Sequence, residues 1–123
     1  MGAEKNFENK VKDFLQREGC YFIKYWGGGD FTRAGVPDLL VCCKGTFVGV
    51  ELKASNGKPK LLQIHHLKGI DQAGGYGILL YPQYYPLFIN FIHCLKQGDL
   101  ENTLYNYGVF KRIIRDWEKK LNG

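Results

Sequence analysis

Residues 38–54 read DLLVCCKGTFVGVELKA. Two apolar runs rich in β-branched and aromatic residues, 38–43 and 46–54, stand on either side of Lys44 and Gly45. A glycine at the second position of a two-residue turn suits the tight turns that join antiparallel strands. The stretch therefore predicts a β-hairpin whose turn is Lys44-Gly45.

The register of this hairpin can be counted outward from the turn. If Cys43 faces Thr46, five further steps along each strand bring Asp38 directly opposite Glu51. Since side chains alternate along a strand, Lys53 shares the face of the two acids. The other face is apolar, with Leu39 opposite Val50 and Val41 opposite Val48. We therefore expect a cluster of two carboxylates and one amine above a buried apolar layer.

Apolar periodicity and glycine or proline breaks mark further elements on both sides of the hairpin. They predict, in chain order, a helix over 6–18, a strand over 20–25, a loop over 26–37, the hairpin, a helix over 60–73, a strand over 76–81, a helix over 87–98 and a last helix over 109–121. Without repeats or linkers, this pattern predicts one α/β domain over residues 1–123 with a mixed sheet flanked by helices, and a parallel crossover through the helix over 60–73.

The composition favours a polyanionic partner. The chain has 17 Lys and Arg against 12 Asp and Glu, a formal charge of +5. Such an excess suits nucleic acid, although many small basic proteins bind nothing acidic. Residues 1–9 are polar, unlike a signal peptide, and no stretch approaches the ~20 apolar residues that span a bilayer. We expect an intracellular, cytoplasmic protein without a membrane partner.

Two carboxylates on one face call for a compensating cation. Their hard oxygen atoms suit Mg²⁺ or Mn²⁺, which take a few carboxylates and keep several waters. With Lys53 to stabilise developing negative charge, such a site could hydrolyse phosphodiester bonds. The alternative is an ordinary solvated cluster of charges on a surface hairpin.

Three short motifs point to one family. Gly-Val-Pro-Asp at 35–38, Glu-Leu-Lys at 51–53 and Gln63 on the next helix resemble the PD-(D/E)XK nuclease motif. Within that superfamily, residues 7–81 most resemble the VRR-NUC domain, which includes stand-alone phage proteins, and are similar in layout to archaeal Holliday junction resolvases. The resemblance implies a restriction-endonuclease-like core, αβββαβ, and a protein that could be phage-encoded in a bacterial host.

The resemblance also implies roles for individual residues. Asp38 and Glu51 would be catalytic metal ligands for Mg²⁺ or Mn²⁺, and the Leu52 carbonyl a further ligand. Lys53 would be the catalytic lysine and Gln63 a catalytic, orienting residue. For Gln63 the alternative is a polar residue on an exposed helix face.

An acid near the start of the first helix completes the implied metal site. Glu8 fits best, and Glu4 is the alternative. Glu8 could instead be a first-turn acid that favours the helix dipole. Gly35 would let the backbone approach a phosphate, or would only satisfy the turn before Pro37.

Basic and aromatic residues beyond the motifs leave more than one reading each. A phosphate track or a solvated face would explain Lys24, Arg33, Lys58, Lys60 and Lys68. Packing, more than base stacking, would explain Tyr81, Tyr84 and Tyr85. Solubility, DNA contact or a dimer would explain the basic, amphipathic last helix with Lys111, Arg112, Arg115, Lys119 and Lys120.

Taken together, the expectation is a metal-dependent endodeoxyribonuclease acting as a homodimer on branched DNA such as Holliday junctions, with no further small-molecule cofactor. The junction preference rests on the family resemblance. The alternatives are a nuclease for flap, nicked or plain duplex DNA and a nucleic-acid-binding module without turnover.

Overall fold

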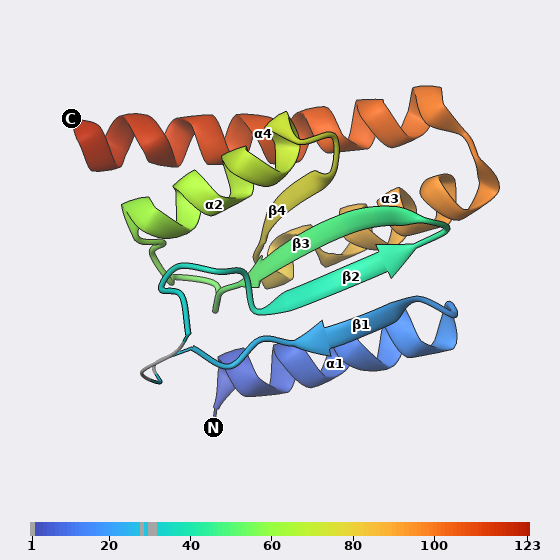
Figure 1. Cartoon of the computed structure of the whole chain (residues 1–123), viewed down its shortest axis with the longest axis horizontal. Coiled ribbons are helices and arrows are strands. Elements are labelled where there is room, and N and C mark those ends of the chain that lie inside the picture. The colour runs from blue at the N-terminus through green and yellow to red at the C-terminus, as the bar shows by residue number, and fades with distance from the viewer. Residues whose placement is uncertain (1, 28, 30–31) are drawn as a thin grey trace.

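The computed structural model describes residues 2–27, 29 and 32–123, and shows a four-stranded sheet flanked by helices (Figure 1). Its elements are α1 (Ala3–Arg17), β1 (Tyr21–Lys24), β2 (Leu39–Cys43), β3 (Thr46–Leu52), α2 (Leu61–Gln72), β4 (Tyr76–Leu80), the short 3-10 helix η1 (Pro82–Tyr84), α3 (Tyr85–Gln97) and α4 (Leu100–Asn122). The predicted order αβββαβ with C-terminal helices is confirmed, and the architecture is restriction-endonuclease-like.

The sheet is mixed, as predicted. Its strands run in the order β1-β2-β3-β4, with antiparallel pairs up to β3 and a parallel β3–β4 pair that is connected through α2. At the hairpin, Lys44 and Gly45 both have positive φ, 52° and 77°, as a type I′ turn requires. The predicted register is confirmed by the pairs Cys43 with Thr46 and Leu39 with Val50.

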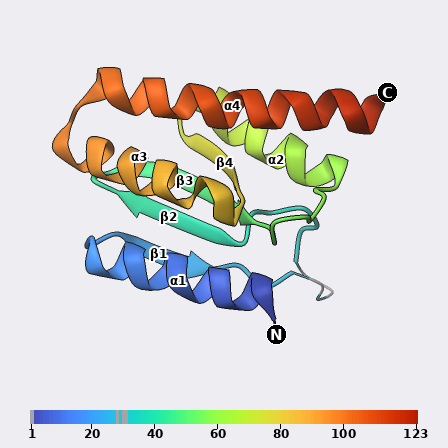
Figure 2. The ribbon, with the colours of Figure 1, turned by 180° about the vertical axis from the view of Figure 1, so that it is seen from behind.

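Helices cover the two faces of the sheet unequally. α1 and α3 lie over the face that carries the predicted apolar layer, and Figure 2 shows both in front of the strands. α2 covers β3 and β4 on the opposite face, and α4 packs beside α2, α3 and β4. α2 lies so close to β4 that a Cβ atom on Gly77 would overlap the Leu67 backbone. This packing brings the start of α2 to the open end of the hairpin.

Some predicted boundaries were wrong. The last helix begins at Leu100 instead of 109, because Gly98 ends α3 with a left-handed φ of 72° and the Asp99 side chain accepts a hydrogen bond from the Asn102 amide at 3.1 Å. The early turns of α4 are held by packing, since Tyr107 is buried in the core. β2 begins one residue later than predicted, and β3 ends two residues earlier than predicted.

Part of the predicted loop over 26–37 cannot be compared, since Gly28, Asp30 and Phe31 lie outside the described residues. In the part of the chain that the structure describes, no helix has the length and apolar character needed to cross a membrane.

Candidate active site

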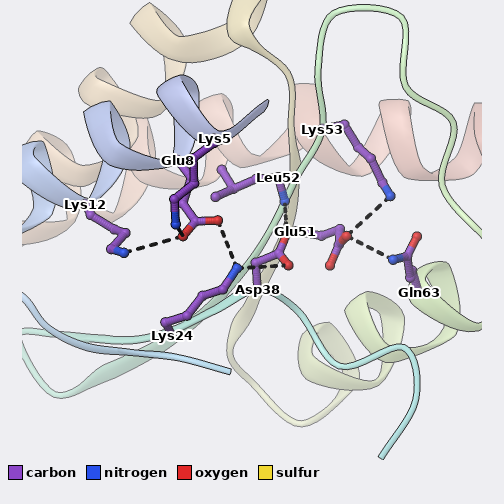
Figure 3. A network of polar contacts seen from close by, with 9 residues as sticks. All are labelled: Lys5, Glu8, Lys12, Lys24, Asp38, Glu51, Leu52, Lys53 and Gln63. Atoms are coloured by element: carbon purple, nitrogen blue, oxygen red, sulfur yellow. Dashed lines mark hydrogen bonds and ion pairs between the residues drawn. The ribbon is translucent and has the colours of Figure 1, made fainter. Parts of the chain in front are cut away.

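The predicted acids and lysine meet at the open end of the β2–β3 hairpin (Figure 3). Asp38 immediately precedes β2, Glu51 lies near the end of β3 and Lys53 directly follows it. Gln63 lies in the first turn of α2 and Glu8 on the inner face of α1. The starts of both helices and the loops that flank the hairpin converge here, as Figure 1 shows at the left of the molecule.

Asp38 is held by hydrogen bonds at both its backbone and its side chain. Its carbonyl accepts from the Tyr25 amide at 2.8 Å, and its Oδ2 accepts from the Leu52 amide at 2.9 Å. The carboxylate is therefore tied to β3 beside Glu51, although the paired part of β2 begins one residue later.

Glu51 is a buried acid with one free oxygen. The residue is 3% exposed, its Oε2 accepts from Gln63 Nε2 at 3.0 Å, and the same oxygen lies 3.5 Å from Lys53 Nζ. Its Oε1 has no hydrogen-bond partner among the described residues. Burial, and then the charge of Asp38, raise the pKa of Glu51 to about 8. A proton or a cation at Oε1 would offset the free-energy cost of burying the Glu51 charge beside Asp38.

Gln63 connects α2 to Glu51. Its Oε1 accepts from the Lys60 amide at 2.9 Å, which satisfies a free donor at the start of the helix, and its Nε2 donates to Glu51. Of the two readings of Gln63, the structure thus supports contact with the acid over a simple exposed face.

Glu8 lies in a cluster of lysines. It is 6% exposed, and its carboxylate contacts Lys24 at 2.9 Å, Lys12 at 3.4 Å and Lys5 at 3.7 Å. Burial by itself raises the pKa of Glu8, but the lysines, chiefly Lys24, more than offset it, so that the pKa lies below its usual value. Glu4, the alternative acid, is exposed. The structure therefore favours Glu8 as the α1 acid near the cluster.

Lys24 bridges the two halves of the site. Its Nζ lies 2.9 Å from Glu8 and 3.6 Å from Asp38, and it is the side chain that joins them in Figure 3. The sequence interpretation placed Lys24 on a phosphate track or a solvated face and did not predict its contacts with the two acids. The missing signal was the register of β1 against β2, which pairs Lys24 with Leu39, next to Asp38.

The residues predicted to bind phosphate are divided by the structure. Arg33, Lys58 and Lys60 are exposed. Lys68 instead contacts Glu118 of α4 at 2.8 Å, outside the cluster of acids. Gly35 has a packing role, because its φ is 83° and an added Cβ would lie 2.7 Å from Leu62 Cγ. Close approach of Gly35 to a phosphate stays a prediction.

The donor atoms of the site fit a hard divalent cation. No group of three or more His, Cys, Asp or Glu side chains that could hold a metal occurs in the described parts of the chain. Mg²⁺ needs fewer, because it keeps several waters and binds through one or two carboxylates. The unpartnered oxygen of Glu51 beside Asp38 offers that kind of position.

An acid, acid and lysine set on the open end of a hairpin, in a mixed sheet of this fold, defines a nuclease of the PD-(D/E)XK type. Residues 2–72, more than half of the 123-residue chain, match the model of the family described as archaeal Holliday junction resolvase (Hjc), and the chain belongs to that family. Its activity class is therefore DNA cleavage. No curated protein and no solved structure shows significant similarity to the chain.

The family match covers only the N-terminal part of the fold. It ends at Gln72, the last residue of α2, so that β4, α3 and α4 lie beyond it. The finer likeness to the VRR-NUC domain stays a prediction.

Proposed function

We propose that this chain is a divalent-metal-dependent endodeoxyribonuclease that cleaves phosphodiester bonds in branched DNA such as Holliday junctions. The observation that carries the proposal is the buried Glu51 beside Asp38 and Lys53, with one oxygen that has no partner in the part of the chain that the structure describes. A structural carboxylate in the same position would be expected to have its hydrogen bonds satisfied. Membership of the resolvase family supports the same activity.

Mg²⁺ or Mn²⁺ would be held by the carboxylates of Asp38 and Glu51 and by the Leu52 carbonyl, with Glu8 nearby. When bound there, the ion would activate a water for attack and neutralise charge on the leaving oxygen. Asp38 is already fixed in place by its bond to the Leu52 amide, so this ligand is preorganised.

Lys53 is the residue of the chain suited to act on the reacting phosphate. Its Nζ lies 3.5 Å from Glu51, and its side chain is 15% exposed, so the amine is shielded yet reachable. From there it would donate a hydrogen bond to a phosphate oxygen and stabilise the negative charge that develops in the transition state. Gln63 would keep Glu51 oriented through the bond at 3.0 Å.

DNA would be bound around this centre by exposed cations. Arg33, Lys58 and Lys60 are exposed on the segments between β1 and β2 and between β3 and α2, and would contact phosphates without reading sequence. We also propose a homodimer, because two active sites related by a two-fold axis suit two paired strands. Exposed apolar side chains on the sheet face that α2 covers only in part, Tyr21, Ile23 and Phe47, support such an interface.

The test is cleavage of labelled four-way junction, flap, nicked and plain duplex DNA with Mg²⁺, Mn²⁺ or a chelator. We expect metal-dependent cutting of the junction by the wild type and none by Asp38→Asn. Asp13→Asn, which makes the same charge change at an exposed position of α1, is the matched control and should cut normally.

Each other outcome changes the proposal in a defined way. Cutting of flap, nicked or plain duplex DNA as well as the junction keeps the nuclease and removes the junction preference. Tight binding without any cutting would favour the binding module. Normal cutting by Asp38→Asn would overturn the assignment of the centre.

A further inference from the structure

A pocket of about 310 Å³ lies next to the candidate active site. It is formed by the loop after β3, by η1 and by the C-terminal half of α4. Its lining includes Lys58, Tyr81, Tyr84, Asp116, Trp117 and Lys120. Both views of the ribbon place the end of α4 at the same end of the molecule as the start of α2 (Figures 1 and 2). α4 lies outside the segment that matches the resolvase family.

The pocket and the active site share a wall. The hydroxyl of Tyr81 donates to the Gly57 carbonyl at 2.8 Å, which fixes the loop after β3 on the pocket side. The same loop packs on Lys53, because a Cβ on Gly57 would lie 3.3 Å from Lys53 Cβ. A strand of DNA bound at Lys53 would thus lie beside the loop that lines the pocket.

The walls combine aromatic rings with cations. Tyr84 and Trp117 are partly buried and pack against the small core under α2 and α4, so their rings are held in place. The Nζ atom of Lys120 lies 4.8 Å from the centre of the Trp117 ring, and Lys58 is exposed on the loop. Rings that stack on bases beside cations that hold phosphates are the means by which proteins bind unpaired strands.

We propose that this pocket binds one unpaired nucleobase of the DNA strand that lies in the active site, stacked on Trp117 and Tyr84. Lys58 and Lys120 contact the phosphates that flank this nucleotide. The proposal rests on the proposed function, since the strand reaches the pocket through the nuclease centre. The volume stands at the small end of ligand pockets, which suits one nucleotide and excludes a duplex.

The carboxylate of Asp116 also favours a nucleobase as the occupant of the pocket. Asp116 is exposed and lines the same pocket, so a phosphate inside it would be repelled. A carboxylate instead accepts hydrogen bonds from the N–H groups of a nucleobase, such as the ring N3–H of thymine or the amino group of cytosine. The geometry therefore separates the base, inside the pocket, from the phosphates at the lysines. Substrates with an unpaired nucleotide beside the cut are preferred as a consequence.

Binding can be followed at Trp117 itself. The chain contains two tryptophans, so a Trp26→Phe background leaves Trp117 as the fluorescent reporter. Without divalent ions, a duplex with a single unpaired thymidine should quench this fluorescence. The same duplex with an abasic site in place of that thymidine, the fully paired duplex and free thymidine monophosphate should quench it much less.

Variants distinguish binding in the pocket from general electrostatic attraction to DNA. Lys120→Ala should weaken binding of the unpaired-thymidine duplex several-fold, and Trp117→Leu by about fivefold or more, since stacking of one base is worth at least that factor. Lys119→Ala removes the same charge from the same exposed turn without lining the pocket, and should bind as the wild type does. Circular dichroism checks that Trp117→Leu is folded, and Lys120→Ala carries the test if it is not.

The outcomes distinguish this inference from the proposed function. Equal quenching by paired, abasic and unpaired DNA, or equal loss of binding in Lys119→Ala and Lys120→Ala, overturns the base pocket even if the wild type cuts DNA. Quenching that needs the unpaired base and Lys120 supports the pocket even if no DNA is cut with Mg²⁺, in which case the nuclease proposal fails alone.

Discussion

Glu8 and Glu51 are two buried acids of the same cluster in opposite surroundings. Glu8 has three lysines within 3.7 Å, and its pKa lies below the usual value. Glu51 has Lys53 at 3.5 Å, an oxygen with no hydrogen-bond partner among the described residues, and a pKa raised to about 8, first by burial and then by the charge of Asp38. The chain itself neutralises the α1 side of the cluster and leaves the β3 side in need of a cation.

This difference places the proposed metal nearer to Glu51 than to Glu8. Lys24 already lies between Glu8 and Asp38, so Glu8 could join a metal only if Lys24 moved away or a water intervened. We therefore expect Glu8 to contribute less to metal binding than Asp38 or Glu51. This asymmetry can be tested experimentally, beginning with the largest expected effect.

Lys53→Ala should abolish cleavage, with a loss of about a thousandfold or more, while DNA affinity changes by no more than a few fold. The reason is that this amine, shielded beside Glu51, acts on the transition state and adds little to the exposed basic surface. The measurement is single-turnover cleavage together with equilibrium binding. Lys60→Ala is the control with the reverse profile, weaker binding and a nearly normal rate at saturation. Unchanged cleavage by Lys53→Ala would remove Lys53 from the centre.

Calorimetry with Mg²⁺ or Mn²⁺ should detect binding to the wild type and none to Asp38→Asn or Glu51→Gln, because each change removes a charged ligand with little change of shape. Glu8→Gln should weaken binding by no more than about tenfold, a smaller loss than that of a direct charged ligand. If Glu8→Gln were as severe as Asp38→Asn, the metal would lie between α1 and β2 instead.

The same titration has a pH dependence. Glu51 must lose its proton to bind a cation, and its pKa in the metal-free protein is about 8. The affinity of the wild type should therefore rise with pH up to about 8, and binding at pH 7 should release a proton into the buffer. The heat of binding, compared between buffers of different ionisation enthalpy, measures the number of protons released. A flat pH profile would show that Glu51 is already ionised.

The hairpin and its acids could be predicted because both depend on local sequence. Alternation with a period of two and a two-residue turn fix which side chains face each other, and a slip by one residue would expose the buried Leu39 and Val50. The same residue-by-residue count from the turn predicted that Asp38, Glu51 and Lys53 lie together at one end of the sheet.

The surroundings of Glu8 could not be predicted in this way. They depend on how α1 docks on β1 and on the register of β1 against β2. The sequence of the loop between these two strands does not reveal that register. The start of α4 was missed for a related reason, since Tyr107 and Phe110 stabilise its early turns only through contacts made in the folded core. The pocket at Trp117 likewise joins residues far apart in the chain.

The smallest expected effect is on stability, and its sign differs between the two acids. In the metal-free protein, Glu51 keeps its proton up to about pH 8, whereas in the unfolded chain it loses it near 4.5. The free energy of unfolding therefore falls as pH rises through this window. Glu51→Gln removes the titration and should be more stable than the wild type at pH 8 and above, by up to a few kcal/mol, but not below pH 4.5.

Glu8 should behave in the opposite way. Its lowered pKa means that it stabilises the fold at neutral pH and that this stabilisation is lost as pH falls through its folded pKa, below 4.5. Glu8→Gln should therefore be less stable than the wild type at pH 7, because three lysines lose their partner. Urea unfolding with a chelator present measures both, and Glu4→Gln, exposed on the same helix, should change little. If Glu51→Gln and Glu8→Gln were equally destabilising at pH 8, the β3 side would not be short of a cation, and the argument for a metal beside Glu51 would lose its physical basis.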